Sequence, residues 1–183
     1  MSTYKVGFIG GGNMARALAG GLVSSGYPPG LLMIADPDER RRAILEHDLP
    51  GVTITADNDA VATAADCLVL AVKPQLMRAV CESLSAAVQA SRPLIISVAA
   101  GTHSRDIDDW LGAELAVVRV MPNQPAMLLE GASGMYANEL TTNEQRDRAT
   151  EIISAVGNYG EIFERYIGEN TPIGLARGLN AQW

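Results

Sequence analysis

The stretch YKVGFIGGGNMA, residues 4–15, decides the fold of this 183-residue chain. It begins with β-branched and aromatic residues that are typical of a strand, Val6, Phe8 and Ile9. Glycines occupy residues 10–12, and the apolar spacing that follows, through Leu18 and Leu22, is that of a helix. The stretch therefore predicts a strand, a tight turn and a helix in immediate succession.

Gly10, Gly12 and Ala15 occupy the three small-residue positions of the motif G-x-G-x-x-G/A. The first glycine lets the chain turn tightly off the strand, and the second, without a Cβ, lets a pyrophosphate approach the backbone. The small third residue lets the helix pack closely on the sheet. The free N–H groups at the start of the helix and the positive end of the helix dipole then face the phosphates. These features predict a dinucleotide-binding turn; a glycine-rich turn without a ligand is the alternative.

Composition and charge limit the remaining choices. The chain is 48% hydrophobic and 19% charged, which is ordinary for a globular protein. Its formal net charge of −7 argues against nucleic acid or an anionic membrane as a partner, because both select basic surfaces. Cys67 and Cys81 lie in apolar patterns without metal-ligand spacing, so we expect buried thiols and no metal site. No signal peptide or run of 18 apolar residues is found, and we expect a cytoplasmic location.

Strand and helix patterns alternate along the chain. Strands are predicted at residues 31–35, 52–54, 67–72, 94–98, 116–121, 131–137 and 159–163, with helical patterns between most of them. This alternation predicts an α/β fold, a Rossmann-type, doubly wound, mainly parallel sheet over residues 1–163, followed by an atypical C-terminal tail at 164–183. Ligands of such sheets bind beyond the carboxyl ends of the strands. We expect the site there, in the loops at 10–13, 35–37, 73–74, 99–101 and 122–125.

Three local patterns give finer predictions. Asp36 is predicted to be the N-cap of the helix that follows the second strand, with Glu39 in the capping-box position. Thr141 and Glu144 are predicted to form a second capping box. The helix after Lys73 and Pro74 is predicted to carry one apolar face, formed by Leu76, Val80, Leu84 and Val88.

Four segments, FIGGGNMA, LAVKPQ, SVAAGT and RVMPNQPAMLLEGASGMYAN, occur in this order. Their order and spacing resemble the N-terminal half of pyrroline-5-carboxylate reductase over about residues 4–163. The resemblance implies reduction of a cyclic imine, 1-pyrroline-5-carboxylate, to proline by a nicotinamide cofactor, in a homo-oligomer. It also implies a second, helical domain that builds the dimer and most of the imine pocket. From Arg165 onward the chain no longer resembles the family, and we expect imine reduction to be slow or absent without such a domain.

The resemblance also implies site residues. The pyrophosphate would be held by Ile9, Gly10, Gly11, Gly12, Asn13 and Met14, and the adenosine would lie near Asn58. The nicotinamide ribose would be bordered by Ala71, Val72, Lys73 and Pro74, and the nicotinamide by Val98, Ala99 and Ala100. The imine entry would be shaped by Met121, Pro122 and Asn123.

Several of these residues have a simpler explanation. Lys73 could be a solvated charge, and Asn58 could be a helix cap beside Asp57. His47 and His103 are isolated and are expected on the surface or at caps. No residue is identified as the general acid, so the catalytic residue stays unknown.

The ribose end of the site, Ala35, Asp36 and Pro37, leaves the cofactor open. An acidic residue at the end of the second strand usually bonds the ribose 2′-hydroxyl and favours NAD, yet Asp36 is also explained as an N-cap. The three arginines at 40–42 could reach a 2′-phosphate. Because the family often prefers NADPH, we expect NADP to be preferred and NAD to be tolerated.

Two other functions are considered. Rossmann reductases of the β-hydroxyacid dehydrogenase and deazaflavin-linked types share the glycine turn, although the segment MPNQPA at 121–126 counts against them. The other alternative is a non-enzymatic NAD(P)-binding module.

Overall fold

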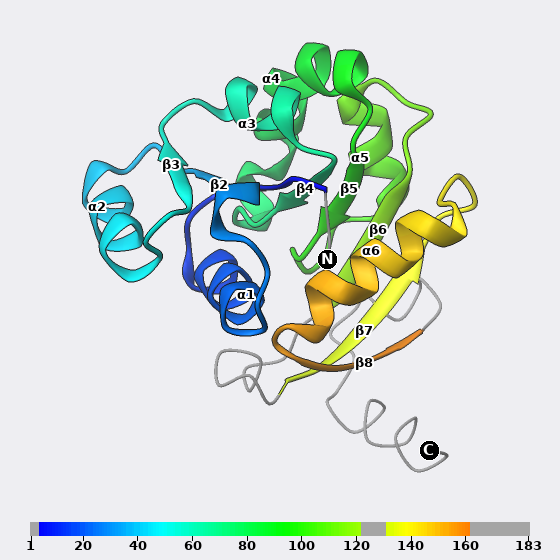
Figure 1. Ribbon diagram of the computed structural model, residues 1–183. Coiled ribbons are helices and arrows are strands. Elements are labelled where there is room, and N and C mark those ends of the chain that lie inside the picture. Colours follow the sequence, from blue (N-terminus) through cyan, green and yellow to red (C-terminus); the bar gives the residue numbers. More distant parts are fainter. Residues whose placement is uncertain (1–3, 122–130, 162–183) are drawn as a thin grey trace.

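The computed structural model of the chain describes residues 4–121 and 131–161. Strands and helices alternate along the first of these ranges (Figure 1). The elements are β1 (Val6–Ile9), α1 (Asn13–Ser24), a 3₁₀ turn η1 (Pro29–Leu31), β2 (Leu32–Ala35), α2 (Glu39–Asp48), β3 (Thr53–Thr55), α3 (Asn58–Ala64), β4 (Cys67–Leu70), α4 (Pro74–Ser91), β5 (Leu94–Ser97), α5 (Ser104–Leu111), β6 (Val117–Met121), β7 (Gly131–Ala137), α6 (Asn143–Ser154) and β8 (Gly157–Glu161).

The strands form one sheet in the order β3-β2-β1-β4-β5-β6-β7-β8. All pairs from β3 to β6 are parallel, so the carboxyl ends of these six strands lie at one edge. β7 runs antiparallel to β6, and β8 is parallel to β7 at the outer edge. The expected Rossmann-type, mainly parallel α/β fold is confirmed.

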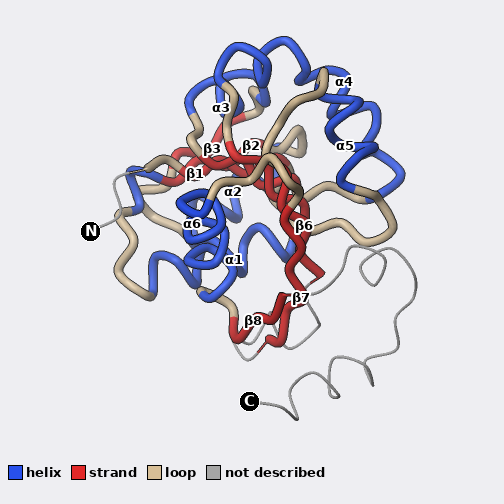
Figure 2. Tube along the Cα trace, turned by 90° about the vertical axis from the view of Figure 1, so that its right-hand side faces the viewer, coloured by secondary structure: helices blue, strands red, loops and turns tan. Residues whose placement is uncertain are grey.

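Helices cover both faces of the sheet. α3, α4 and α5 lie on one face, and α1, α2 and α6 lie on the other (Figure 2). β4 shows how a strand serves both layers: Cys67 and Val69 belong to the core under α1 and α6, whereas Leu68 and Leu70 belong to the core under α3, α4 and α5. A strand buried on both sides reads as a continuous apolar run, as this one does.

Several predicted bounds are corrected by one or two residues. β2 begins at Leu32, β3 is Thr53–Thr55, β4 ends at Leu70, β5 ends at Ser97, β6 begins at Val117 and β8 is Gly157–Glu161. Ala71 and Val72 were predicted to belong to β4, but they lie beyond its last paired residue, Leu70. A hydrophobic pattern does not show where the hydrogen-bonded pairing of strands ends. β7 matches its prediction to the residue. The predicted tail at 164–183 lies outside the described residues.

Two predictions within helices are corrected: the predicted face of α4 is right for Leu84 and Val88 but not for Leu76, and the predicted capping box of α6 names the wrong residues. The inward stripe of α4 is Met77, Cys81, Leu84 and Val88, while Leu76 is 54% exposed. Leu76 and Val80 each precede a residue of that stripe by one position. Because they are also four residues apart, the sequence pattern does not distinguish them from the inward residues. The capping box of α6 is formed by Thr142 and Gln145, because the Thr141 hydroxyl donates to Asn138 instead.

The thiols of Cys67 and Cys81 are free and buried, as expected. Burial raises the pKa of each thiol to about 12, so both stay protonated at neutral pH. Among the residues at 4–121 and 131–161, no helix is long and apolar enough to cross a membrane.

Candidate functional site

Backbone hydrogen bonds tie four loops together where the parallel strands end. Each bond continues the sheet by one step: Gly10 donates to the Ala35 carbonyl (2.8 Å), Asp36 to Thr55 (3.0 Å), Ala71 to Ile9 (2.9 Å) and Val98 to Leu70 (3.2 Å). The loops that follow β1, β2, β4 and β5 therefore lie side by side at the carboxyl edge. The sequence predicted this assembly from the alternation of strands and helices alone.

The three consecutive glycines have three different environments. Gly10 has φ +94°, and a Cβ there would lie 2.8 Å from the Ala71 carbonyl oxygen, so only glycine fits the turn. A Cβ on Gly11 would lie 2.5 Å from Cδ1 of the buried Leu45. A Cβ on Gly12 would meet no atom of residues 4–121 and 131–161 within 4 Å. Gly12 thus borders open space, whereas its neighbours border the protein.

The open space at Gly12 adjoins the N-terminus of α1. Gly12 is the N-cap, and as a glycine it makes no side-chain cap bond to the first turn. The first backbone N–H groups of a helix have no intrahelical partner. In α1 the Arg16 N–H donates to the Gly12 carbonyl (3.0 Å). Ala15, the third position of the motif, is fully buried against the sheet. The geometry suits an anionic group placed against uncapped N–H donors and the positive end of the helix dipole.

Asp36 is not the N-cap of α2. That position belongs to Asp38, whose carboxylate accepts from the N–H groups of Arg40 and Arg41. The Asp36 carboxylate instead turns back under the glycine turn, where Oδ2 accepts from the Gly11 N–H at 2.7 Å. The sequence pattern failed here because Asp36 and Asp38 are both good caps, and only the backbone direction selects between them.

Three donors surround the Asp36 carboxylate, which is 1% exposed. Besides the Gly11 bond, Oδ1 accepts from the Asp38 N–H (2.9 Å) and Oδ2 accepts from Nη1 of Arg41 (3.0 Å). Burial by itself raises the pKa of Asp36. The two backbone N–H groups and the Arg41 guanidinium lower it by more, so the pKa lies below its ordinary value.

The other residues assigned to the nicotinamide end lie at the same edge. Ala71, Val72 and Val98 are half-buried, and Ala99 is buried at 6% exposure. Lys73 is exposed and forms the N-cap position of α4 without a side-chain cap bond, and Pro74 and Ala100 are exposed too. Met121 is half-buried at the end of β6, while Pro122 and Asn123 lie outside the described residues.

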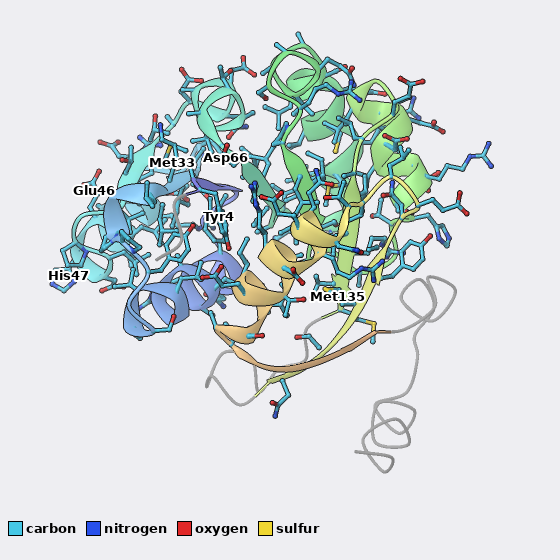
Figure 3. The ribbon with its side chains drawn as sticks, turned by 45° about the vertical axis from the view of Figure 1, so that its right-hand side comes forward. Tyr4, Met33, Glu46, His47, Asp66 and Met135 are labelled. Atoms are coloured by element: carbon cyan, nitrogen blue, oxygen red, sulfur yellow. The ribbon has the colours of Figure 1, made fainter. Side chains whose placement is uncertain are left out.

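Asn58 and the two histidines lie near the ends of helices. Asp57 caps α3 by accepting from the Ala60 N–H, so Asn58 is the first helical residue and not the cap. His47 lies at the periphery, at the end of α2, with Nδ1 3.0 Å from a carboxylate oxygen of Asp48 (Figure 3). His103 is exposed at the N-cap position of α5 and makes no cap bond.

Two contributions to this edge were not predicted from the sequence. The first is the packing role of Gly11, which only its contact with Leu45 reveals. The second is that Arg41 and Arg42 both turn their guanidinium groups back to the end of β2. No group of three potential metal ligands occurs among residues 4–121 and 131–161.

The first comparison concerns the N-terminal half of the chain, which contains the glycine turn. The sequence model of a family described as NADP oxidoreductase, coenzyme F420-dependent, matches residues 5–101. This range contains the glycine turn, the Asp36 carboxylate, the loop after β4 and the first part of the loop after β5.

The remaining comparisons extend over almost the whole chain. Pyrroline-5-carboxylate reductase of Vibrio alginolyticus is 45% identical over 176 residues, which cover 96% of this chain and 64% of that protein. The solved structure of a pyrroline-5-carboxylate reductase from Coxiella burnetii matches with a TM-score of 0.89 at 35% identity, over 98% of this chain and 68% of its own. The structure of the Plasmodium falciparum enzyme with NADP bound matches with a TM-score of 0.81 at 24% identity, over 100% of this chain and 66% of its own. At that identity the last likeness shows the fold alone.

The extent of these matches has two consequences. The 176-residue alignment is too long to end at residue 163, so the resemblance continues into 164–183, and the limit set in the sequence analysis is wrong. The chain also spans less than two thirds of the length of the Vibrio relative.

Proposed function

Because this chain belongs to the pyrroline-5-carboxylate reductase family, we propose that it forms the cofactor-binding part of an NADPH-dependent reductase. Its substrate would be the cyclic imine 1-pyrroline-5-carboxylate, and its product L-proline, in the last step of proline biosynthesis. NADPH would be the preferred cofactor and NADH a tolerated one. The observation that carries the proposal is the uncapped N-terminus of α1, which faces open space at Gly12 on the carboxyl edge of the sheet.

The residues present fit a dinucleotide. The pyrophosphate would lie over Gly12 and accept hydrogen bonds from the first N–H groups of α1, including those of Asn13 and Met14. The Gly11 N–H is already bound to Asp36, so Gly11 would shape the turn without contacting the phosphates. The adenosine would extend toward the ends of β2 and β3, with Asp36 and Asn58 nearby.

The nicotinamide end would lie across β4 and β5. Ala71, Val72, Lys73 and Pro74 would border its ribose, and Val98, Ala99 and Ala100 would line the ring. When bound, the cofactor supplies a hydride to the imine carbon of the substrate. Protonation of the imine nitrogen makes this carbon more electrophilic. The chain's own contribution would be apolar walls from Val72 and Val98 that hold the ring in place and exclude water from one side.

The imine would enter beside the end of β6. Met121 would form part of this entrance, together with Pro122 and Asn123 of the adjoining segment. No described side chain is assigned as proton donor. The proposal therefore places orientation and desolvation at this edge and leaves the proton to groups outside it.

The family relation favours the reductase over the other functions considered. The 45% identity over 96% of the chain supports imine reduction over a β-hydroxyacid dehydrogenase activity. A cytoplasmic location and a homo-oligomeric assembly, as expected for the family, are part of the same proposal.

The test combines binding with turnover. NADPH and NADH binding to the 183-residue chain is measured by calorimetry, and oxidation of NADPH by pyrroline-5-carboxylate is followed by absorbance. The same assays are run on a fusion of this chain to the C-terminal part of the Vibrio relative. We expect both proteins to bind the dinucleotide and the fusion to turn over faster. Orientation of the reactants can lower the activation barrier by about 7–11 kcal/mol, and an imine held on one side only loses part of this effect.

Each alternative predicts a different result. Binding without turnover by both proteins would favour the non-enzymatic module. Oxidation of a β-hydroxyacid in preference to imine reduction would favour the dehydrogenase type. Absence of dinucleotide binding would contradict the proposal.

A further inference from the structure

The end of β2 contains a buried carboxylate with two guanidinium groups against it. The carboxylate is that of Asp36, and the guanidinium groups are those of Arg41 and Arg42, from the first turn of α2. An acidic residue at this position usually receives a ribose 2′-hydroxyl, which would make the chain selective for NAD. The contacts of Asp36 point to a different role.

Both carboxylate oxygens of Asp36 already accept hydrogen bonds within the protein. Oδ1 accepts from the Asp38 N–H, and Oδ2 accepts from both Gly11 and Arg41. With 2% of its side chain exposed, Asp36 offers almost no surface to a ribose. A 2′-hydroxyl that displaced Arg41 would replace a bond between two charged groups by a bond with only one charged partner.

The two arginines keep donors to spare. Arg41 uses Nη1 for Asp36 at 3.0 Å, and 49% of its side chain remains exposed. Arg42 uses Nη1 for the carbonyl oxygens of Asp36 (2.8 Å) and Pro37 (2.9 Å). A guanidinium carries five N–H donors, so each group can still bind an anion while it is held at the strand end.

The acidic neighbours are accounted for. The Asp38 carboxylate caps α2 through the N–H groups of Arg40 and Arg41. Glu39 is exposed in the first turn of α2. Asp36 is the carboxylate in contact with the Arg41 guanidinium, and it is the group that fixes where this cation lies.

We propose that Asp36 is a positioning residue for a 2′-phosphorylated adenosine, and that Arg41, with Arg42 beside it, is the group that binds the phosphate. The proposal rests on the proposed function and names the part of the site that selects NADP. One oxygen, Oδ2, bonds both the glycine turn and Arg41. Asp36 therefore sets the spacing between the pyrophosphate position at Gly12 and the 2′-phosphate position at Arg41.

The proposal reverses the usual expectation for an acid at this position. If Asp36 repelled a 2′-phosphate, its removal would improve NADP binding. If Asp36 holds Arg41 in place, its removal weakens NADP binding and changes NAD binding less. The ratio of the two affinities is a readout that a merely structural role would not move.

The experiment measures NADP⁺, NAD⁺ and adenosine 2′-monophosphate binding to the 183-residue chain by calorimetry. The variants are Arg41→Ala, Arg41→Lys and Asp36→Asn, with Arg40→Ala as the matched control, since Arg40 is an exposed arginine of the same helical turn. Arg41→Ala should weaken NADP⁺ and adenosine 2′-monophosphate about 10- to 100-fold, the range of one bond to a charged group. NAD⁺ should change less than about threefold, Arg41→Lys should restore part of the loss, and the control should match the wild type.

Asp36→Asn should lower the ratio of NADP⁺ to NAD⁺ affinity, by about 5- to 30-fold if most of the Arg41 contribution depends on its position. A rise in that ratio would overturn the proposal, as would an unchanged ratio in Arg41→Ala. A wild type that binds NAD⁺ well and NADP⁺ poorly would overturn this inference while leaving a dinucleotide-dependent function standing. A wild type that binds neither would contradict the proposed function as well.

Discussion

Replacing Gly12 by valine should separate binding from folding. A Cβ at this position would meet no atom of the described part of the chain within 4 Å. The backbone of Gly12, with φ −71° and ψ −175°, is extended and open to any residue. The valine side chain would therefore fit the folded protein but would fill the space proposed for the pyrophosphate.

The expected magnitudes follow from these contacts. Valine is a poorer N-cap than glycine, so the free energy of unfolding should fall by no more than about 1 kcal/mol. Binding should suffer far more, because the pyrophosphate would lose its bonds to the first N–H groups of α1. Each bond to a charged group contributes about 1.5–3 kcal/mol, so the loss of two amounts to about 10²- to 10⁴-fold in affinity.

Urea unfolding and calorimetry with NADP⁺ measure the two quantities. Gly11→Ala is the matched control, since the added methyl group would lie 2.5 Å from Leu45 and 3.2 Å from Cβ of Asp36. Overpacking of this kind costs about 1–3 kcal/mol of stability. The neighbouring glycines should thus differ in stability: the free energy of unfolding falls clearly in Gly11→Ala, whereas Gly12→Val loses binding while it stays close to wild-type stability. NADP⁺ binding by folded Gly12→Val within about threefold of the wild type would refute the placement of the pyrophosphate.

Three further predictions concern the rest of the described chain. Cys67 and Cys81, whose pKa values are raised to about 12 by burial, should not be alkylated by iodoacetamide at pH 8 until urea unfolds the protein; rapid labelling of the native state would contradict their burial. Thr142→Ala should lower the free energy of unfolding by about 1 kcal/mol by removing the bond to the Gln145 N–H, while Thr142→Ser should retain it. Folding lowers the pKa of Asp36, so its contribution to stability is present above its unfolded pKa and is lost as the pH falls through the folded value. The melting temperature of the wild type should therefore fall more steeply below about pH 4 than that of Asp36→Asn. Parallel plots of melting temperature against pH for the two proteins would contradict this.

The order of elements and the edge of the sheet that carries the site follow from the sequence. Strand and helix patterns depend on local spacing and composition, and in this chain they alternate cleanly enough to predict the parallel sheet. A parallel sheet places its strand ends together, so the loops after β1, β2, β4 and β5 could be grouped without coordinates. The glycine motif supplied the nature of the expected ligand, because its three positions have steric requirements that can be stated residue by residue.

The roles of Asp36, Gly11 and Leu76 were decided by tertiary structure. Asp36 lies 2.7 Å from the Gly11 N–H, and Leu45 closes on the same glycine, although neither contact has a signature in the local pattern. The outward position of Leu76 depended on how α4 turns against the sheet. In each case the deciding interaction joins residues from different elements, so its free energy depends on a distance that exists only once the sheet has formed.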